Sequence, residues 1–222
     1  IGSPRLVDEQ IGFIKNVELE KMILVLQPPR IIGMSVLTIN SKRAYMLADA
    51  IKAIDPKATI ILGGIHPTVV PDEVLKNKNI DVAVRGEGEK TLKELVDLIT
   101  NDKDYSQVQG ISIRRNGNII HNLDRSLIME LNEIPAYPFD LFEKNLEQYS
   151  NFGAVSTSRG CPYNCIFCSS RSVSGKRYRY FSVDRVLSEI KILVEKYHIK
   201  TIMFMDDNIA VNQKYFTSLL DA

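Results

Sequence analysis

The stretch Ala154-Val-Ser-Thr-Ser-Arg-Gly-Cys161-Pro-Tyr-Asn-Cys165-Ile-Phe-Cys168 places three cysteines within eight residues, directly after a short predicted strand. The 222-residue sequence contains no other cysteine. An odd number of cysteines in so short a segment does not suit a disulfide framework, whereas clustered thiolates suit a metal site. Three thiolates are one fewer than a [4Fe–4S] cube needs, so one iron would stay open to a substrate or cofactor. A structural zinc would need a fourth ligand nearby, and the next histidine, His198, comes late in a long predicted helix.

The segment after the cysteines predicts the start of a (β/α) architecture. Ser182 is a candidate N-cap for a helix whose apolar residues recur at helical spacing as far as Tyr197. Residues 201–205 form the next predicted strand, which ends at Asp206-Asp207-Asn208. Active-site groups of such barrels lie at the carboxyl ends of the strands, so this triplet is a candidate site. A strand-end turn is the alternative, because Asp and Asn favour turns and caps.

The first hundred residues alternate in the same way between β-rich runs and helical patterns. Strands are predicted over residues 31–38, 58–62 and 80–84. Helices are predicted over residues 17–26, from a cap at Ser41 to a stop at Asp55, over 71–76, and around Leu92 to Ile99. Strands separated by helices imply right-handed crossovers and a parallel sheet.

The alternation of strand and helix patterns ends near Tyr105. Residues 110–115 and 118–122 flank Asn116-Gly117, which is a strong signal for a two-residue hairpin turn. An irregular stretch containing Pro135 and Pro138 follows, and it is typical of a connector between domains.

Charge and hydropathy exclude several classes of partner. The 28 basic and 27 acidic side chains give a net charge of +1, so the chain has no global field for nucleic acid or an anionic membrane. No apolar run approaches the roughly 18 to 20 residues that span a bilayer, and no signal segment opens the chain. We therefore expect a cytoplasmic protein with no nucleic-acid or membrane partner. The sequence does not begin with Met and ends in a helical pattern, so we expect both ends to be cut.

The segment Ser158-Arg-Gly-Cys161-Pro-Tyr-Asn-Cys165-Ile-Phe-Cys168 resembles the cluster loop of the radical S-adenosylmethionine (SAM) superfamily. The resemblance implies an oxygen-sensitive, anaerobic chemistry in which Cys161, Cys165 and Cys168 ligate a [4Fe–4S] cluster and SAM chelates the open iron. Reduction would then cleave SAM to methionine and a 5′-deoxyadenosyl radical. The resemblance also implies SAM contacts from Phe167, the aromatic residue before the last cysteine. Similar contacts are implied for the strand-end triplet: Asp206, Asp207 and Asn208.

The N-terminal half resembles the cobalamin (B12)-binding domain that precedes the barrel in one large radical SAM class. Ser35-Val36-Leu37 matches the S-x-L element of that domain, and Gly63-Gly64 matches its G-G element one βα unit later. The resemblance implies that Ser35, Leu37, Gly63 and Gly64 surround the nucleotide tail of cobalamin. Glycines allow a backbone to approach a flat ligand at the carboxyl edge of a parallel sheet.

The histidines of the N-terminal half, together with one missing motif, leave open whether this half binds cobalamin. The D-x-H-x-x-G element, whose histidine binds cobalt in that family, is absent. We expect His66 to be a loop residue and His121 to lie on the surface of the hairpin. A structural or protein-contact module remains the alternative for this half.

These observations predict an α/β protein with three parts. Residues 1–104 form an N-terminally incomplete Rossmann-like (flavodoxin-like) parallel sheet that resembles the cobalamin-binding domain. Residues 105–150 form the hairpin and linker, and residues 151–222 form the first βα units of a partial (β/α) radical SAM barrel. About two βα units fit in the last part, at roughly 30 residues each, so we expect this fragment to be inactive alone.

The predicted function is that of a cobalamin-domain-containing radical SAM enzyme for methyl transfer or cyclisation of an unknown small-molecule substrate. One alternative is a radical SAM methylthiotransferase, whose N-terminal domain carries three further cysteines that this chain lacks. The other is a non-catalytic iron–sulfur electron-transfer protein, which would normally supply four cysteines to each cluster.

The cysteine region also carries an excess of positive charge. No acidic residue occurs between Gln148 and Asp184. The basic residues there are Arg159, Arg171, Lys176, Arg177 and Arg179. A basic rim would attract an acidic electron donor such as flavodoxin or ferredoxin. The alternative is a solvated loop with ordinary charges.

Overall fold

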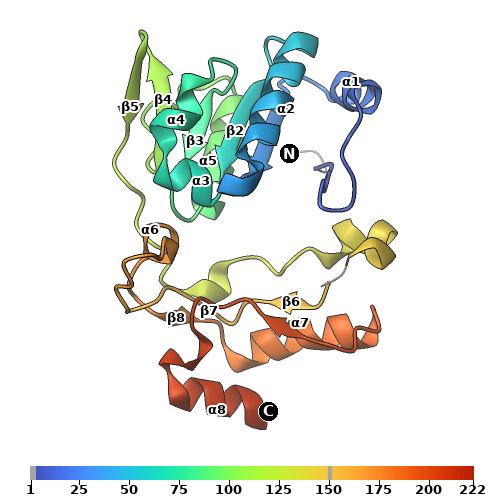
Figure 1. Cartoon of the computed structure of the whole chain (residues 1–222), viewed down its shortest axis with the longest axis vertical. Coiled ribbons are helices and arrows are strands. Elements are labelled where there is room, and N and C mark those ends of the chain that lie inside the picture. The colour runs from blue at the N-terminus through green and yellow to red at the C-terminus, as the bar shows by residue number, and fades with distance from the viewer. Residues whose placement is uncertain (1–3, 150–151) are drawn as a thin grey trace. The chain divides into compact units, whose positions relative to one another are not determined.

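The computed structural model describes residues 4–149 and 152–222, which form two compact units (Figure 1). The N-terminal unit comprises Ile14–Leu127. The C-terminal unit comprises Pro4–Phe13 and Ile128–Ala222. Within the described ranges, no helix is long and apolar enough to cross a membrane.

The N-terminal unit contains one five-stranded sheet in the order β1-β2-β3-β4-β5. Its strands are β1 (Ile31–Ser35), β2 (Thr59–Gly63), β3 (Val82–Val84), β4 (Ile111–Arg115) and β5 (Asn118–His121). The first three strands pair in parallel, whereas β4 runs antiparallel to both β3 and β5. The predicted parallel α/β sheet is confirmed, and the predicted hairpin extends the edge of this sheet.

Helices cover both faces of this sheet. They are α1 (Asn16–Val25), α2 (Ser41–Ile54), α3 (Ile65–Val69), α4 (Pro71–Lys76) and α5 (Glu89–Thr100). Successive residues of a strand point to opposite faces, so Ile60 and Leu62 pack in one core with α1, α2 and α4. Ile61 lies between them and packs in a second core with Leu95 of α5. Apolar residues on both faces make β2 a central strand.

Two local details explain the connections in this unit. Strand β1 is shorter than predicted, because the chain turns into a 3₁₀ helix at Thr38–Asn40. Asn40, rather than the predicted Ser41, therefore occupies the N-cap position of α2. The hairpin turn has φ values of 51° at Asn116 and 80° at Gly117, as a type I′ turn requires.

The C-terminal unit is built on one parallel strand pair, β6 (Ala154–Val155) with β9 (Met203–Phe204). Helix α7 (Val183–Glu195) lies between them in sequence, and the Ser182 hydroxyl accepts a hydrogen bond from the Arg185 amide at 3.3 Å. The predicted βα unit and its cap are therefore confirmed. Helix α8 (Gln213–Asp221) follows β9, after a 3₁₀ turn at Ile209–Val211. A further 3₁₀ helix occupies Leu131–Glu133, and 3₁₀ turns cover Phe139–Gln148 with a break at Asn145.

A second, antiparallel strand pair encloses the cysteine loop. Strand β7 (Ser158–Arg159) precedes the loop and pairs with β8 (Arg179–Tyr180), which follows it. Between them lie the cysteines and the short helix α6 (Ser170–Ser174). The sequence does not predict this pair, because two-residue strands leave no periodic signal.

The carboxylate of Asp206 joins the end of β9 to the start of β7. It accepts hydrogen bonds from the Thr157 amide at 3.1 Å and the Thr157 hydroxyl at 2.9 Å, and another from the Ser158 hydroxyl. Thr157 and Ser158 are buried, and the Thr157 carbonyl also accepts from the Tyr215 hydroxyl at 3.2 Å. Burial raises the pKa of Tyr215 to about 12, so this phenol stays a neutral donor at physiological pH.

We predict that Asp206→Asn destabilises the C-terminal unit by about 2 kcal/mol, because an amide group cannot accept all of these hydrogen bonds. Hydrogen–deuterium exchange of peptides covering β6 and β9 measures this change within one unit. Asp207→Asn is the matched control, since Asp207 is exposed and should leave the exchange rates unchanged. Equal protection in the two variants would contradict the prediction.

Candidate functional site

The three thiols lie on one loop and line one small cavity. None of them forms a disulfide. Cys161 is half-buried, while Cys165 and Cys168 are exposed. The other residues that line this cavity are Tyr163, Ser170 and Arg171. The structure therefore brings together the three cysteines that the sequence predicts as ligands.

The base of this loop is closed by tight backbone packing. Gly160, directly before Cys161, has φ of +84°, and a Cβ there would lie 2.3 Å from the Arg177 carbonyl oxygen. A side chain at this position would push β7 and β8 apart. The Cys161 amide also donates to the Gly175 carbonyl at 3.3 Å, which holds the first cysteine against the end of the loop.

Arg179 stabilises the same region from inside the unit. Its guanidinium is buried and donates to the carbonyls of Ile128 at 2.7 Å and Ser174 at 2.6 Å. The prediction that Arg179 contributes to a basic rim is therefore wrong. Arg171, Lys176 and Arg177 are exposed, so an excess of positive charge does remain on the surface of this region.

The residues proposed to contact SAM differ in how free they are. The Asp206 carboxylate already accepts hydrogen bonds from Thr157 and Ser158. Asn208 accepts a hydrogen bond from the Ala210 amide at 3.2 Å, which makes it a local cap. Asp207 is exposed, and the Phe167 ring is 89% exposed beside Cys168. Asp207 and Phe167 thus keep the side-chain surface that a ligand could use.

Three thiolates around one cavity match the number of protein ligands of a cubane with one open iron. In the described ranges, no three His, Cys, Asp or Glu side chains converge on a point that would suit one ion. A cube is ligated at separate iron corners, so its thiolates need not converge on one point. The Ser170 hydroxyl oxygen is buried in the wall of the same cavity and has no hydrogen-bond partner within the described part of the chain. Anionic sulfur in the cavity would supply the missing acceptor.

A second candidate site lies at the carboxyl edge of the parallel strands in the N-terminal unit. The Val36 amide, after β1, donates to the Gly63 carbonyl at 2.8 Å, and the His66 amide donates to the Val36 carbonyl at 3.1 Å. These bonds place Ser35 and Leu37 beside the Gly63-Gly64 turn. The structure therefore brings these four predicted residues together.

The two glycines of this edge differ in what a side chain would meet. Gly64 has φ of +98°, and a Cβ there would lie 3.0 Å from the Val36 amide nitrogen and carbonyl oxygen. The positive φ and the close backbone of Val36 therefore disfavour a side chain at Gly64. A Cβ on Gly63 would meet only the Val84 Cβ at 3.9 Å, which is an ordinary contact. The packing of the chain itself leaves Gly63 unexplained, and a ligand approaching the backbone would explain it.

His66 is not the loop residue that the sequence predicts. It lies in the first turn of α3 and is 2% exposed. Its Nε2 lies 2.7 Å from the Tyr45 hydroxyl oxygen, and its Nδ1 lies 3.3 Å from Thr38 Oγ1. Both ring nitrogens are therefore occupied inside the protein. His121 lies on β5 with an exposed side chain, as predicted.

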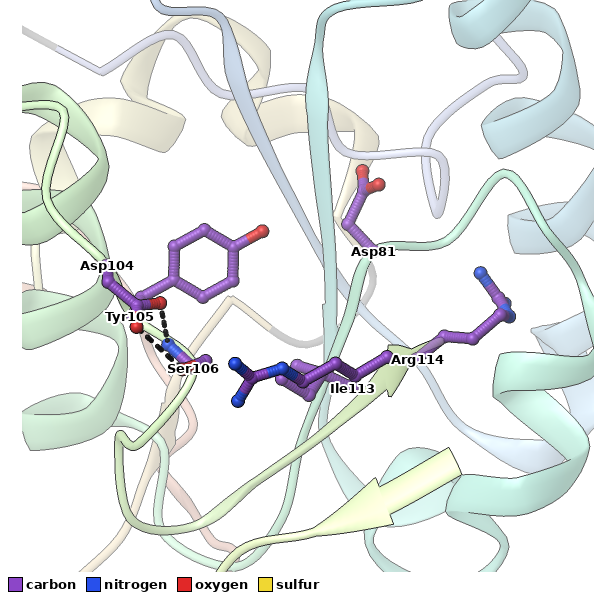
Figure 2. Close-up of a pocket in the computed structure, with 7 residues that line it drawn as sticks. Asp81, Asp104, Tyr105, Ser106, Ile113 and Arg114 are labelled. Atoms are coloured by element: carbon purple, nitrogen blue, oxygen red, sulfur yellow. Dashed lines mark hydrogen bonds between the residues drawn. The ribbon is translucent and has the colours of Figure 1, made fainter. Parts of the chain in front are cut away.

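A hollow of about 340 Å³ lies at the amino end of the parallel strands, opposite the glycine edge (Figure 2). Both carboxylates and one of the two arginines that line it already have partners in the protein. Asp104 accepts from the Ser106 amide and hydroxyl at 2.8 Å each, as the dashed lines in Figure 2 show. Asp81 accepts from the Ile60 amide at 2.7 Å, and Arg114 donates to the Asn77 carbonyl at 2.9 Å. This hollow is a structural feature of the sheet rather than a candidate active site.

Comparison with known proteins gives two family matches. Residues 16–96 match the family described as the B12 binding domain, and residues 155–220 match the radical SAM superfamily. An uncharacterized methyltransferase of Pyrococcus horikoshii is 40% identical over 189 residues, which cover 84% of this chain and 41% of that protein. Bacteriochlorophyllide d C-12(1)-methyltransferase of Chlorobaculum tepidum is 31% identical over 186 residues, covering 83% of this chain and 37% of that protein. The chain thus spans about two fifths of the length of these relatives.

Solved structures agree with this assignment. The radical SAM enzyme OxsB, solved with aqua-cobalamin and SAM bound, has a TM-score of 0.76 and 27% identity, over 91% of this chain and 28% of that one. The methyltransferase TsrM of Kitasatospora setae shares the fold, with a TM-score of 0.76 and 17% identity over 93% of this chain and 42% of that one. These matches favour the main interpretation over a methylthiotransferase or an electron carrier. The chain belongs to the radical SAM superfamily, in the class that carries a B12-binding domain ahead of the radical SAM domain.

Proposed function

We propose that this chain is the cofactor-binding part of a cobalamin-dependent radical SAM enzyme that methylates or cyclises a small-molecule substrate. The observation that carries the proposal is the single cavity lined by Cys161, Cys165 and Cys168, the full set of cysteines in the sequence. The relatives support the reaction class, because they include methyltransferases and an anaerobic magnesium-protoporphyrin IX monomethyl ester cyclase of Synechocystis.

The residues of the C-terminal unit would play three roles: they would ligate the cluster, contact SAM or position the cysteine loop. Cys161, Cys165 and Cys168 would each ligate one iron of a [4Fe–4S] cluster and leave the fourth iron without a protein ligand. When bound and reduced, such a cluster supplies the electron that cleaves the sulfonium bond of SAM. Asp207 presents an exposed carboxylate that can accept hydrogen bonds from the amino group of SAM, and the Phe167 ring offers a flat apolar surface to its adenine. Asp206 would not contact SAM but would hold in place the segment that leads into the cysteine loop.

The carboxyl edge of the N-terminal unit would bind cobalamin. Gly63 leaves its backbone open to close approach, and Ser35 adds an exposed hydroxyl. Three apolar side chains beside them are exposed, namely Leu37, Ile39 and Ile65. An extended ligand with polar and apolar parts would cover all of these groups at once. His66 is not proposed as a cobalt ligand, because its ring nitrogens already contact Tyr45 and Thr38.

We predict that the chain, reconstituted without oxygen, binds about four irons and four sulfides, as one cubane requires. Adding SAM should change the electron paramagnetic resonance (EPR) spectrum of the reduced cluster. Replacing any of the three cysteines by Ala should abolish the spectrum, because each thiolate holds a different iron. A wild-type chain that binds zinc and assembles no cubane would overturn the proposed function.

The paired glycines give a test of cobalamin binding. Gly63→Ala should preserve the fold but weaken binding of hydroxocobalamin at least about tenfold, because the new methyl group would occupy the space of the ligand. Binding is measured by titration of the corrin absorption spectrum. Gly64→Ala is the contrasting variant: it should destabilise the N-terminal unit by roughly 2 kcal/mol, since it combines a positive φ with a backbone clash.

Hydrogen exchange distinguishes these two effects. Normal protection together with weak binding in Gly63→Ala would support a ligand at this edge. Wild-type affinity in Gly63→Ala would instead show that the edge is structural, as in a protein-contact module.

An acidic electron donor of the flavodoxin or ferredoxin type would reduce the cluster. Lys176 and Arg177 support this proposal, because they are exposed on the segment that closes the cysteine loop. Arg171 also lines the thiol cavity, where it donates to Asn164. Opposite charges on the two proteins would accelerate their encounter.

We predict that the double variant Lys176→Glu, Arg177→Glu slows cluster reduction by flavodoxin several-fold at low ionic strength, and that the rate becomes less sensitive to salt. Stopped-flow absorbance measures both quantities. The control is Lys191→Glu, Lys200→Glu, which makes the same charge change on exposed residues of α7 and the β9 approach. Equal slowing by the two double variants would show that net charge, rather than a docking surface, sets the rate.

A further inference from the structure

The Ser170 hydroxyl is a buried polar group that the described residues leave unsatisfied. Its oxygen is shielded from solvent and has no hydrogen-bond partner among the described residues. Buried hydroxyls in native proteins are nearly always hydrogen-bonded, because they lose their bonds to water on folding. An unsatisfied hydroxyl therefore points to a partner other than the described residues.

The position of Ser170 indicates where that partner lies. Ser170 is the first residue of α6 and follows Cys168 by two positions. It lines the same cavity as all three thiols. The other strong donor of that cavity, the Arg171 guanidinium, is directed to the Asn164 side chain. Ser170 thus presents an available O–H donor at the place where the cubane is proposed.

We propose that Ser170 donates a hydrogen bond to a sulfur of the [4Fe–4S] cluster, either a cysteine thiolate or a bridging sulfide, and thereby raises the reduction potential of the cluster. This inference rests on the proposed function, since it requires the cubane. Sulfur in the cluster carries negative charge and accepts hydrogen bonds, and such bonds are among the factors that set cluster potentials. Reduction adds one electron, so the bond is stronger in the reduced state and favours it.

Ser169 provides a matched control one residue away. Its side chain is exposed and makes no capping hydrogen bond to α6. Ser169→Ala therefore removes the same hydroxyl group from the same loop without touching the cavity. Any effect of Ser170→Ala that Ser169→Ala lacks comes from the buried position.

The test is a potentiometric titration of the reconstituted chain, followed by EPR. In Ser170→Ala, the ratio of reduced to oxidised cluster at a fixed potential should fall about tenfold, which corresponds to a midpoint about 59 mV lower for a one-electron couple. Ser169→Ala should titrate like the wild type. Ser170→Thr, which keeps the hydroxyl, should recover most of the difference.

A second measurement detects the bond itself. After exchange into D₂O, pulsed EPR of the wild type should show an exchangeable deuteron coupled to the cluster, and Ser170→Ala should lose that coupling. If Ser170→Ala loads too little cluster, Ser170→Gly is the second truncation, and it introduces no new side chain into the cavity. Cubanes in the wild type and the truncated variants with equal midpoints and equal deuteron couplings would overturn the inference. A wild type without a cubane would instead refute the proposed function.

Discussion

The hydrogen bonds from Thr157 and Ser158 to the Asp206 carboxylate fix the geometry on which the C-terminal unit depends. They join the end of β9 to the segment that leaves β6 and enters the cysteine loop. The strands themselves are two residues long, so their ladders alone hold this junction weakly. Removing a carboxylate even partly from water is costly unless donors surround it, and here the donors are the residues that must be held. The loop that carries three thiols therefore begins from a fixed point.

The same principle organises the glycine edge of the N-terminal unit. Backbone groups at the carboxyl ends of β1 and β2 bond to each other, and Gly64 permits that approach because no side chain stands between them. His66 then fills the space behind the turn, where it contacts Tyr45 and Thr38. In both units, buried polar contacts shape the carboxyl ends of parallel strands, and these are the ends where α/β folds bind ligands.

The sequence predicted what periodicity and turn chemistry can encode. The parallel strands, the hairpin at Asn116-Gly117 and the cap at Ser182 follow from local patterns, and the structure confirms them. The sequence alone could not show that the Arg179 side chain is buried. An arginine among other basic residues is expected to be exposed unless the carbonyls that accept its hydrogen bonds are known. His66 was misplaced for a similar reason: its partners lie 21 and 28 residues earlier in the chain. The short pair β7–β8 also depends on contacts that are distant in sequence.

These long-range contacts sort the conspicuous polar residues into two groups. Asp206, Arg179 and His66 are satisfied within the chain, so their chemistry is used to build the two edges. Asp207 remains open to solvent, and the Ser170 hydroxyl is buried without a partner in the described part of the chain. The residues that are satisfied within the chain hold parts of the fold in place. Asp207 and Ser170 can still form hydrogen bonds with a ligand. Three thiols and one unsatisfied hydroxyl around the same cavity are best explained by a single anionic, sulfur-rich occupant.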